Sequence, residues 1–157
     1  MKARVIVAST RAATGVYEDT SGPVLRGQLV WHVSGIEVDR VIVPDGDQVR
    51  DEIAAAVSEG VDVVITSGGT GLTSKDRTPE MTRELLDYEI PGIPEAIRRV
   101  GVRNGVPSAI LSRGTAGVAG TTFIVNLAGS KGAAKDGMTV LGPILEHIVD
   151  QIHDGDH

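Results

Sequence analysis

The residues with the clearest chemical potential form a glycine-rich loop at 67–71, with the sequence Ser-Gly-Gly-Thr-Gly. The loop follows the apolar run 61–66, which is typical of a buried strand. Ligands of open α/β sheets bind outside the carboxyl ends of strands, and glycine lets backbone N–H groups approach a phosphate closely. The loop has neither the lysine of a Walker A motif nor the spacing of a dinucleotide fingerprint. It predicts a phosphate site, although a tight turn without a ligand would explain it equally well.

Two aspartates, Asp45 and Asp76, are candidate magnesium ligands. Asp76 lies between Lys75 and Arg77, just before an expected helix N-terminus, where anions are favoured. Asp45 follows the apolar run 38–43, so it too is expected at the carboxyl end of a strand. If the strands are neighbours, both carboxylates face one crevice, and such oxygen ligands beside phosphates suit Mg²⁺. Taken singly, Asp45 is explained equally well as a turn residue, and Asp76 is explained better as one.

Three further loops, at 9–22, 112–120 and 126–132, are rich in glycine and hydroxyl side chains. Each follows a short apolar run, and each could donate N–H and O–H groups to a polar ligand. Each could also be an ordinary surface connection. Four such loops after apolar runs favour one shared site for a polar ligand.

The composition excludes several classes of protein. The chain has 157 residues, 41% of them hydrophobic and 23% charged, which is enough for one domain with a real core. It has no cysteine, so disulfides, thiolate catalysis and cysteine-built zinc sites are excluded. A net charge of -6 argues against nucleic-acid partners, and no run approaches the ~20 apolar residues of a membrane span. We therefore expect a cytoplasmic protein without nucleic-acid or membrane partners.

The loops need strands and helices to position them, and hydrophobic periodicity predicts both. Strands are expected at 4–8, 38–43, 61–66, 109–111 and 122–125, with 113–120 as a glycine-rich connection. Helices are expected at 23–30, from an Asp47 cap to Gly60, from a Thr78 cap to about residue 86, and at 92–103. A last helical region extends to residue 152 and contains Pro143, which predicts a kink or a restart.

The alternation of strands and helices predicts one α/β domain over residues 1–152. The run 61–66 is apolar on both faces, so it is expected at the centre of a mostly parallel sheet with helices on both sides, in three α/β/α layers. Residues 153–157 form a polar tail that we expect to fray.

Together these segments resemble the MoaB/Mog family, whose fold also forms the G domain of gephyrin-like proteins. The resemblance covers nearly the whole chain in the family's order. Three positions depart from it: Thr10 stands where many members carry Asp, and Ala128 and Lys131 stand where Pro is usual. The matching elements are Ser9-Thr10-Arg11 with residues 15–19 and 21–23, Pro44-Asp45, residues 67–71, residues 76–80, Ser112-Arg113 and residues 126–130.

The resemblance implies a MogA-like fold and a magnesium-dependent transfer of the adenylyl group of ATP to the terminal phosphate of molybdopterin. Asp45 and Asp76 would be the catalytic residues, as magnesium ligands. Ser112 and Ser130 are the candidates for binding molybdopterin. The substrate-binding residues that the matched motifs imply are Ser9, Thr10, Ser67, Gly68, Gly69, Thr70, Gly71, Thr78, Ser112, Arg113, Asn126, Gly129 and Ser130.

The resemblance also implies a homotrimer, with the downstream molybdenum insertase as a protein partner. Two other functions stay open, beside a purely structural trimer, which would not need four polar loops at strand ends. One is a non-catalytic molybdopterin carrier of the same family, which magnesium-dependent turnover would exclude. The other is an unrelated nucleotide-binding enzyme, such as a small phosphotransferase, which failure to bind a pterin would favour.

Overall fold

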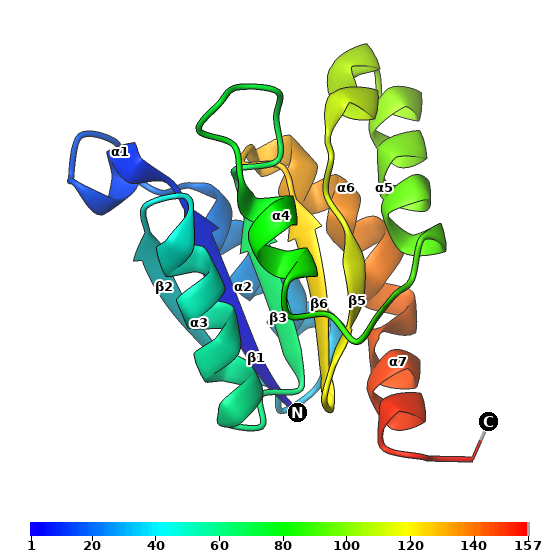
Figure 1. The fold of residues 1–157 in the computed structure, drawn as a ribbon. Helices are drawn as coiled ribbons and strands as arrows, with labels where there is room; N and C mark the ends of the chain where they lie inside the picture. Colours follow the sequence, from blue (N-terminus) through cyan, green and yellow to red (C-terminus); the bar gives the residue numbers. More distant parts are fainter. Residues whose placement is uncertain (157) are drawn as a thin grey trace.

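A six-stranded sheet in the order β2-β1-β3-β6-β5-β4 forms the middle layer of the protein (Figure 1). The structure is a computed structural model, and it describes residues 1–156. Strands β2, β1, β3 and β6 are parallel, whereas β5 runs antiparallel to β6 and β4 antiparallel to β5. The strands are β1 (Lys2–Ala8), β2 (Glu37–Val43), β3 (Val63–Ser67), β4 (Tyr88–Glu89), β5 (Ala116–Ala119) and β6 (Thr122–Leu127).

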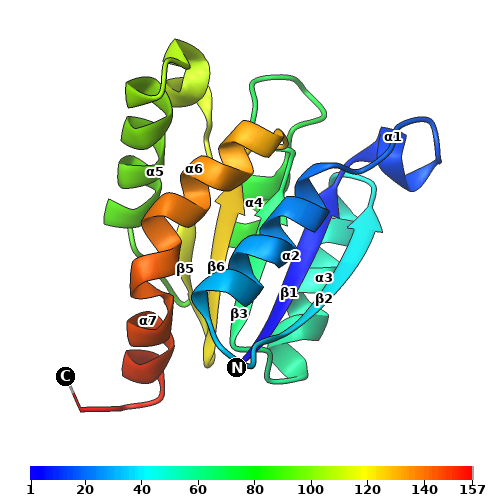
Figure 2. The same cartoon turned by 180° about the vertical axis from the view of Figure 1, so that it is seen from behind.

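Helices cover both faces of this sheet, which confirms the expected three-layer α/β/α architecture. Helices α3 (Asp47–Ser58) and α4 (Thr78–Arg83) lie on the face turned forward in Figure 1. The opposite face, seen in Figure 2, carries α2 (Ser21–His32), α5 (Gly92–Arg103), α6 (Lys131–Leu141) and α7 (Leu145–Ile152). The short helix α1 (Thr10–Ala13) lies at the rim beside β2, and the 3-10 segments are η1 (Pro107–Leu111) and η2 (Gly142–Ile144).

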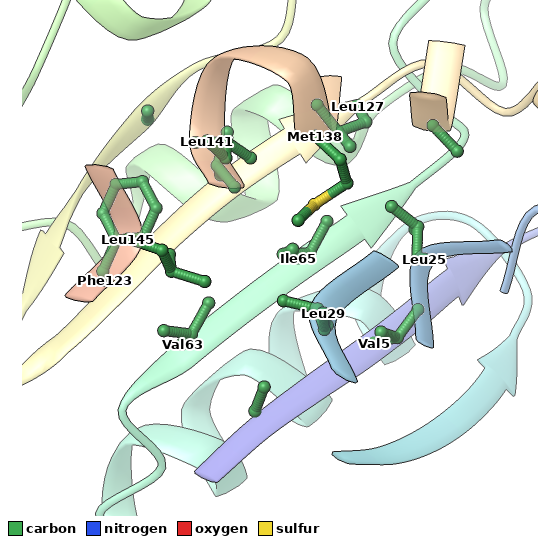
Figure 3. Packing of buried hydrophobic residues seen from close by; sticks show 14 of the residues in the cluster. Val5, Leu25, Leu29, Val63, Ile65, Phe123, Leu127, Met138, Leu141 and Leu145 are labelled. Carbon is green, nitrogen blue, oxygen red and sulfur yellow. The ribbon is translucent and has the colours of Figure 1, made fainter. Parts of the chain in front are cut away.

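Aliphatic side chains form the core on both faces of the sheet. The strands alternate between the faces, so Ile6, Val64 and Ile124 meet α3 while their neighbours meet the other helices. β3 is buried throughout, as expected for a central strand. Figure 3 shows the larger cluster, in which α2, α6 and α7 pack on the strands through Leu25, Leu29, Met138, Leu141 and Leu145 against Val5, Val63, Ile65, Phe123 and Leu127.

The strand predicted at 109–111 is wrong. These residues belong to η1, which starts at Pro107 and contains no buried residue. The strand is β5, inside the stretch 113–120 that we expected to be a glycine-rich connection. Gly117 explains the glycine content, because a Cβ there would overlap the carbonyl oxygen of Tyr88 on β4. A glycine that allows two strands to approach closely was therefore mistaken for a loop signal.

Several helix boundaries also differ from the prediction. α2 begins at Ser21 rather than at residue 23, α4 ends at Arg83, and the N-cap positions of α3 and α4 are Gly46 and Arg77 rather than Asp47 and Thr78. No side chain caps α3, and its N-cap residue is Gly46 because a φ of 105° is readily adopted only by glycine. The restart at Pro143 is confirmed, since η2 separates α6 from α7.

One residue of the C-terminal tail, His153, contacts the segment before β3. His153 Nε2 lies 3.2 Å from Asp62 Oδ1, and the fraying expected of residues 153–157 stays a prediction. His157 lies outside the described residues. Over residues 1–156, no helix combines the length and the apolar character that crossing a bilayer requires.

Candidate functional site

The polar loops meet at one edge of the sheet, where β1, β3 and β6 end side by side. Val7 is aligned with Ser67, and Ser67 with Leu127. Because β5 is antiparallel, the segment 112–115 that enters it reaches the same edge. The segment thus lies at the expected site, but it precedes a strand instead of following one.

Asp45 is held by donors from two elements. Its Oδ1 accepts from the Gly46 N–H at 2.7 Å and from Thr78 Oγ1 at 3.1 Å, and its Oδ2 accepts from the Arg77 N–H at 3.3 Å. Burial raises the pKa of Asp45, and the nearby charge of Asp76 raises it further, while the three hydrogen bonds act in the opposite direction. The three hydrogen bonds therefore hold the carboxylate in place, but they offset only part of the cost of burying its charge.

The strands before the two aspartates are not neighbours, contrary to the condition set from the sequence. β1 lies between β2 and β3. Asp45 reaches the site because it extends beyond β2 to the start of α4, where Arg77 and Thr78 bind it. Asp76 closes its own loop, since its Oδ2 accepts from Thr73 N–H at 3.0 Å and from Thr73 Oγ1 at 2.7 Å.

The glycine loop packs directly against both carboxylates. A Cβ on Gly69, whose φ is 69°, would overlap Asp45 Oδ2 and Thr78 Oγ1, and a Cβ on Gly71 would lie 2.9 Å from Asp76 Oδ2. Only glycine allows this approach of backbone to carboxylate. The loop and the two aspartates therefore form one site.

Arg113 connects the segment before β5 to this site. Its Nε donates to the Gly71 carbonyl at 2.9 Å, and its Nη2 donates to the Asp76 carbonyl at 2.7 Å. Its Nη1 pairs with Glu80, and this contact lowers the pKa of the Glu80 carboxyl. The planar guanidinium thus fixes the position of Asp76 and of the glycine loop together.

Asn126 joins four parts of the edge from a buried position. Its Nδ2 donates to Thr66 Oγ1 and to Thr82 Oγ1, both at 2.9 Å, and its Oδ1 accepts from the Thr115 N–H at 3.1 Å. These contacts tie β6 to β3, to α4 and to the segment before β5. Both polar atoms of the side-chain amide, Nδ2 and Oδ1, are thereby engaged inside the protein.

A cavity of about 630 Å³ opens beside the glycine loop, between η1, α5 and α6. One end is polar, formed by residues 68–71, Asp76, Ser112 and Ser130. The other end is formed largely by apolar side chains, among them Ile97, Val106, Ala109 and Ala133. Such a cavity suits a ligand with phosphates at one end and a ring system at the other.

Comparison with known proteins decides the family. Residues 4–147 match the family model described as "Probable molybdopterin binding domain". The chain belongs to the MoaB/Mog family. The solved structure of MogA has a TM-score of 0.93 and 50% sequence identity, covering 97% of this chain and 99% of that one. The Mog protein from Mycobacterium ulcerans has a TM-score of 0.88 and 48% identity, covering 96% and 98%.

Curated MoaB/Mog relatives extend the comparison. The molybdopterin adenylyltransferase of Helicobacter pylori (strain J99) is 34% identical over 151 residues, which cover 94% of this chain and 85% of that protein. Molybdenum cofactor biosynthesis protein B of Bacillus cereus is 33% identical over 138 residues, covering 86% and 82%. The chain spans 48% of a molybdenum cofactor biosynthesis bifunctional protein of Synechococcus elongatus and 23% of the Drosophila melanogaster molybdenum cofactor synthesis protein cinnamon.

The residues matched to MoaB/Mog motifs fall into two groups in this structure. One group lines the cavity, and the other lies outside its wall. Several of the second group make internal contacts: Ser67 Oγ donates to Ser21 Oγ at 2.8 Å, and Ser9 caps α1. The cavity group contains Gly68, Gly69, Thr70, Gly71, Asp76, Ser112, Asn126, Gly129 and Ser130. The other group contains Ser9, Thr10, Asp45, Ser67, Thr78 and Arg113.

The apolar end of the cavity was missed by the sequence analysis of this MoaB/Mog chain. Its side chains come from α5, η1 and α6, where apolar residues were assigned only to the core. One signal was present: Gly101 lies inside a helix, and such a glycine often has a packing reason. A Cβ there would lie 2.6 Å from the Cβ of Ala109.

The donors of the site fit magnesium. Asp45 and Asp76 supply carboxylate oxygens, the hard ligands that Mg²⁺ prefers. Within residues 1–156, no three His, Cys, Asp or Glu side chains form a complete metal cage. Mg²⁺ commonly takes one or two carboxylates and completes its coordination with water and substrate phosphates, so two carboxylates are compatible with a magnesium site.

Proposed function

We propose that this protein is a molybdopterin adenylyltransferase of molybdenum cofactor biosynthesis. It would transfer the adenylyl group of ATP to the terminal phosphate of molybdopterin in a magnesium-dependent reaction, giving adenylyl-molybdopterin and pyrophosphate. The observation that carries the proposal is the contact of Asp45 and Asp76 with the glycine loop, at the polar end of a cavity with an apolar far end. The names of relatives such as the Helicobacter pylori enzyme support it.

The reaction requires no covalent catalysis by the protein. A phosphate oxygen of molybdopterin attacks the α-phosphorus of ATP, a P–O bond forms, and the bond to the β-phosphate breaks with release of pyrophosphate. The attacking oxygen is already anionic, so no general base is needed. The barrier comes from bringing two polyanions together. Magnesium bound by Asp45 and Asp76 would offset part of this charge.

The remaining residues would bind and orient the substrates. The backbone of residues 68–71 and the N-terminus of α6, which Ser130 caps, present N–H groups suited to phosphate. Ser112 would add a hydroxyl, while Arg113 and Asn126 would hold the loops in place. Ser9 and Thr10 lie toward β2, away from the cavity, and we assign them to the nucleotide.

Substitution of the aspartates tests the proposal. We expect Asp45→Ala and Asp76→Ala to leave a folded protein and to reduce adenylyl transfer by about a hundredfold or more, because charge stabilisation carries the reaction. The assay follows pyrophosphate and adenylylated pterin from molybdopterin, ATP and Mg²⁺. Wild-type product that disappears with EDTA is the expected result. Full activity in either variant would contradict the role of that aspartate.

The same assay separates the other functions. Molybdopterin binding by wild-type protein without product would indicate the carrier function. Absence of pterin binding would instead favour an unrelated nucleotide-binding enzyme.

We also propose that the protein works as a homotrimer and passes its product to a molybdenum insertase. Exposed apolar side chains support an assembly: Trp31 is 79% exposed, beside Val30 at 50%. A cytoplasmic location stays a prediction from the sequence.

A further inference from the structure

The apolar end of the cavity contains one carboxylate, Asp136, to which neither the sequence motifs nor the proposed reaction gives a role. Asp136 lies on α6 and lines the cavity together with Gly101, Ala109 and Ala133. It is half-buried, and its partner is the neutral amide of Asn104 rather than a cation. A carboxylate has two acceptor oxygens, so Asp136 keeps acceptor capacity for a ligand beyond the bond from Asn104.

The position of the Asp136 carboxylate is fixed from one side. Asn104 Nδ2 donates to Oδ1 at 2.7 Å. The second oxygen, Oδ2, lies near Gly101, where a Cβ would come within 3.7 Å of it. Gly101 lines the cavity, so its missing side chain leaves space on that side of the carboxylate. Asn104 thus acts as a positioning residue.

We propose that Asp136 recognises the pyrimidine edge of the pterin by accepting hydrogen bonds from its N3–H and its 2-amino group. This inference rests on the proposed function, since molybdopterin carries that edge. A 2-amino-4-oxo pyrimidine presents two adjacent donors, and an ionised carboxylate is an acceptor with two oxygens. Hydrogen bonds to an ionised acceptor are stronger than neutral ones.

The spacing along α6 agrees with this assignment. Ser130 caps the helix at the polar end of the cavity, and Asp136 is six residues further along. At a helical rise of 1.5 Å per residue, this places them about 9 Å apart along the axis. The fused rings of molybdopterin bridge a comparable distance between the pyrimidine edge and the phosphate-bearing side. One ligand can therefore reach both ends.

Asp136→Asn is the first test, because asparagine keeps the shape and can still bind Asn104. We expect the Kd for molybdopterin, measured by ultrafiltration, to rise about tenfold to a hundredfold, the range for hydrogen bonds to a charged group. The Kd for ATP should be unchanged. Glu95→Gln is the matched control, since it removes an exposed carboxylate of α5 that does not line the cavity. An unchanged molybdopterin Kd in Asp136→Asn would overturn the proposal.

A second measurement separates recognition from a structural effect. Pterin and lumazine share the bicyclic ring, but lumazine has an oxygen in place of the 2-amino group. Pterin should displace molybdopterin from the wild-type protein at a lower concentration than lumazine does, because the lumazine oxygen would face the Asp136 carboxylate. In Asp136→Asn this preference should disappear or reverse, since an amide can donate. An unchanged preference would overturn the proposal even if both ligands bound more weakly.

These results are distinguishable from failure of the proposed function. If the wild type makes adenylyl-molybdopterin while Asp136→Asn changes neither Kd nor preference, only the inference fails. If binding depends on Asp136 but no product forms, the adenylyl-transfer function fails and the pterin site stands.

Discussion

Asp45 is a half-buried carboxylate held against the glycine loop. Burial opposes its ionisation, yet hydrogen bonds from Gly46, Arg77 and Thr78 hold the carboxylate in one place. Part of the charge is left for a cation to neutralise. A cation bound there would favour the ionised form of Asp45 and lower its pKa.

A pH prediction follows for the metal-free protein. Burial raises the pKa of Asp45 above its unfolded value of about 3.9. The protonated form therefore stabilises the folded protein below that unfolded pKa, and this stability is lost as the pH rises through the higher folded pKa. Asp45→Asn has no such loss. We expect the difference in unfolding free energy, variant minus wild type, to increase between pH 3 and pH 7. Urea titrations in EDTA measure it, and a constant difference would mean that Asp45 titrates normally.

Gly69 provides a second prediction at the residue scale. Gly69→Ala places a Cβ against Asp45 and Thr78 at a φ of 69°, whereas Gly60→Ala has a similar φ of 74° and nothing within 4 Å. Gly60→Ala should cost about 1 kcal/mol of unfolding free energy from backbone strain alone and leave activity unchanged. Gly69→Ala should cost more and abolish most activity. Equal losses in urea denaturation would contradict the close packing at Gly69.

At the scale of elements, the long periodic segments were predictable and the short ones were not. The run 61–66 and the helix at 92–103 were recognised because many residues share one pattern. β5 has four residues and β4 has two, so tertiary contacts rather than local pattern determine them. Gly117 is an example, because a Cβ at this position would overlap the backbone of β4.

The candidate site was predictable to a similar degree. The sequence placed the aspartates, the glycine loop and Ser130 at strand or helix ends, where motifs are local. It could not show that Arg113 bonds the Gly71 and Asp76 carbonyls, or that α5 and η1 wall the cavity. Such contacts join segments far apart in the chain.

The Arg113 contacts predict how the Asp76 loop behaves. Arg113→Lys keeps the charge but removes the planar fork that bonds two carbonyls. We expect the Mg²⁺ concentration for half-maximal activity to rise about fivefold to tenfold, as for loss of one or two hydrogen bonds. Amide hydrogen exchange at residues 71–77 should also accelerate. Arg83→Lys is the control, since Arg83 pairs with Glu89 at an exposed site, and an equal effect in both variants would contradict a specific clamp.

At the scale of the whole molecule, the exposed apolar side chains remain to be explained. Trp31 is the single tryptophan, and its 79% exposure places it on the surface rather than in the core. The proposed trimer would cover such a surface.

Trp31 makes the assembly measurable. Sedimentation should give about three times the 16.4 kDa of one chain. If the trimer buries Trp31, its fluorescence maximum should move to longer wavelength when dilution separates the subunits. A sedimenting monomer would refute the trimer, and a trimer whose emission is insensitive to dilution would place Trp31 outside the interface.

The hairpin of β5 and β6 has a consequence for the width of the binding site. The two strands run in opposite directions from a tight turn at Gly120, so their far ends carry Ser112 and Arg113 on one side and Asn126 and Gly129 on the other. The turn and the hydrogen bonds between Thr115 and Asn126 therefore fix the spacing of the two segments beside the ligand site.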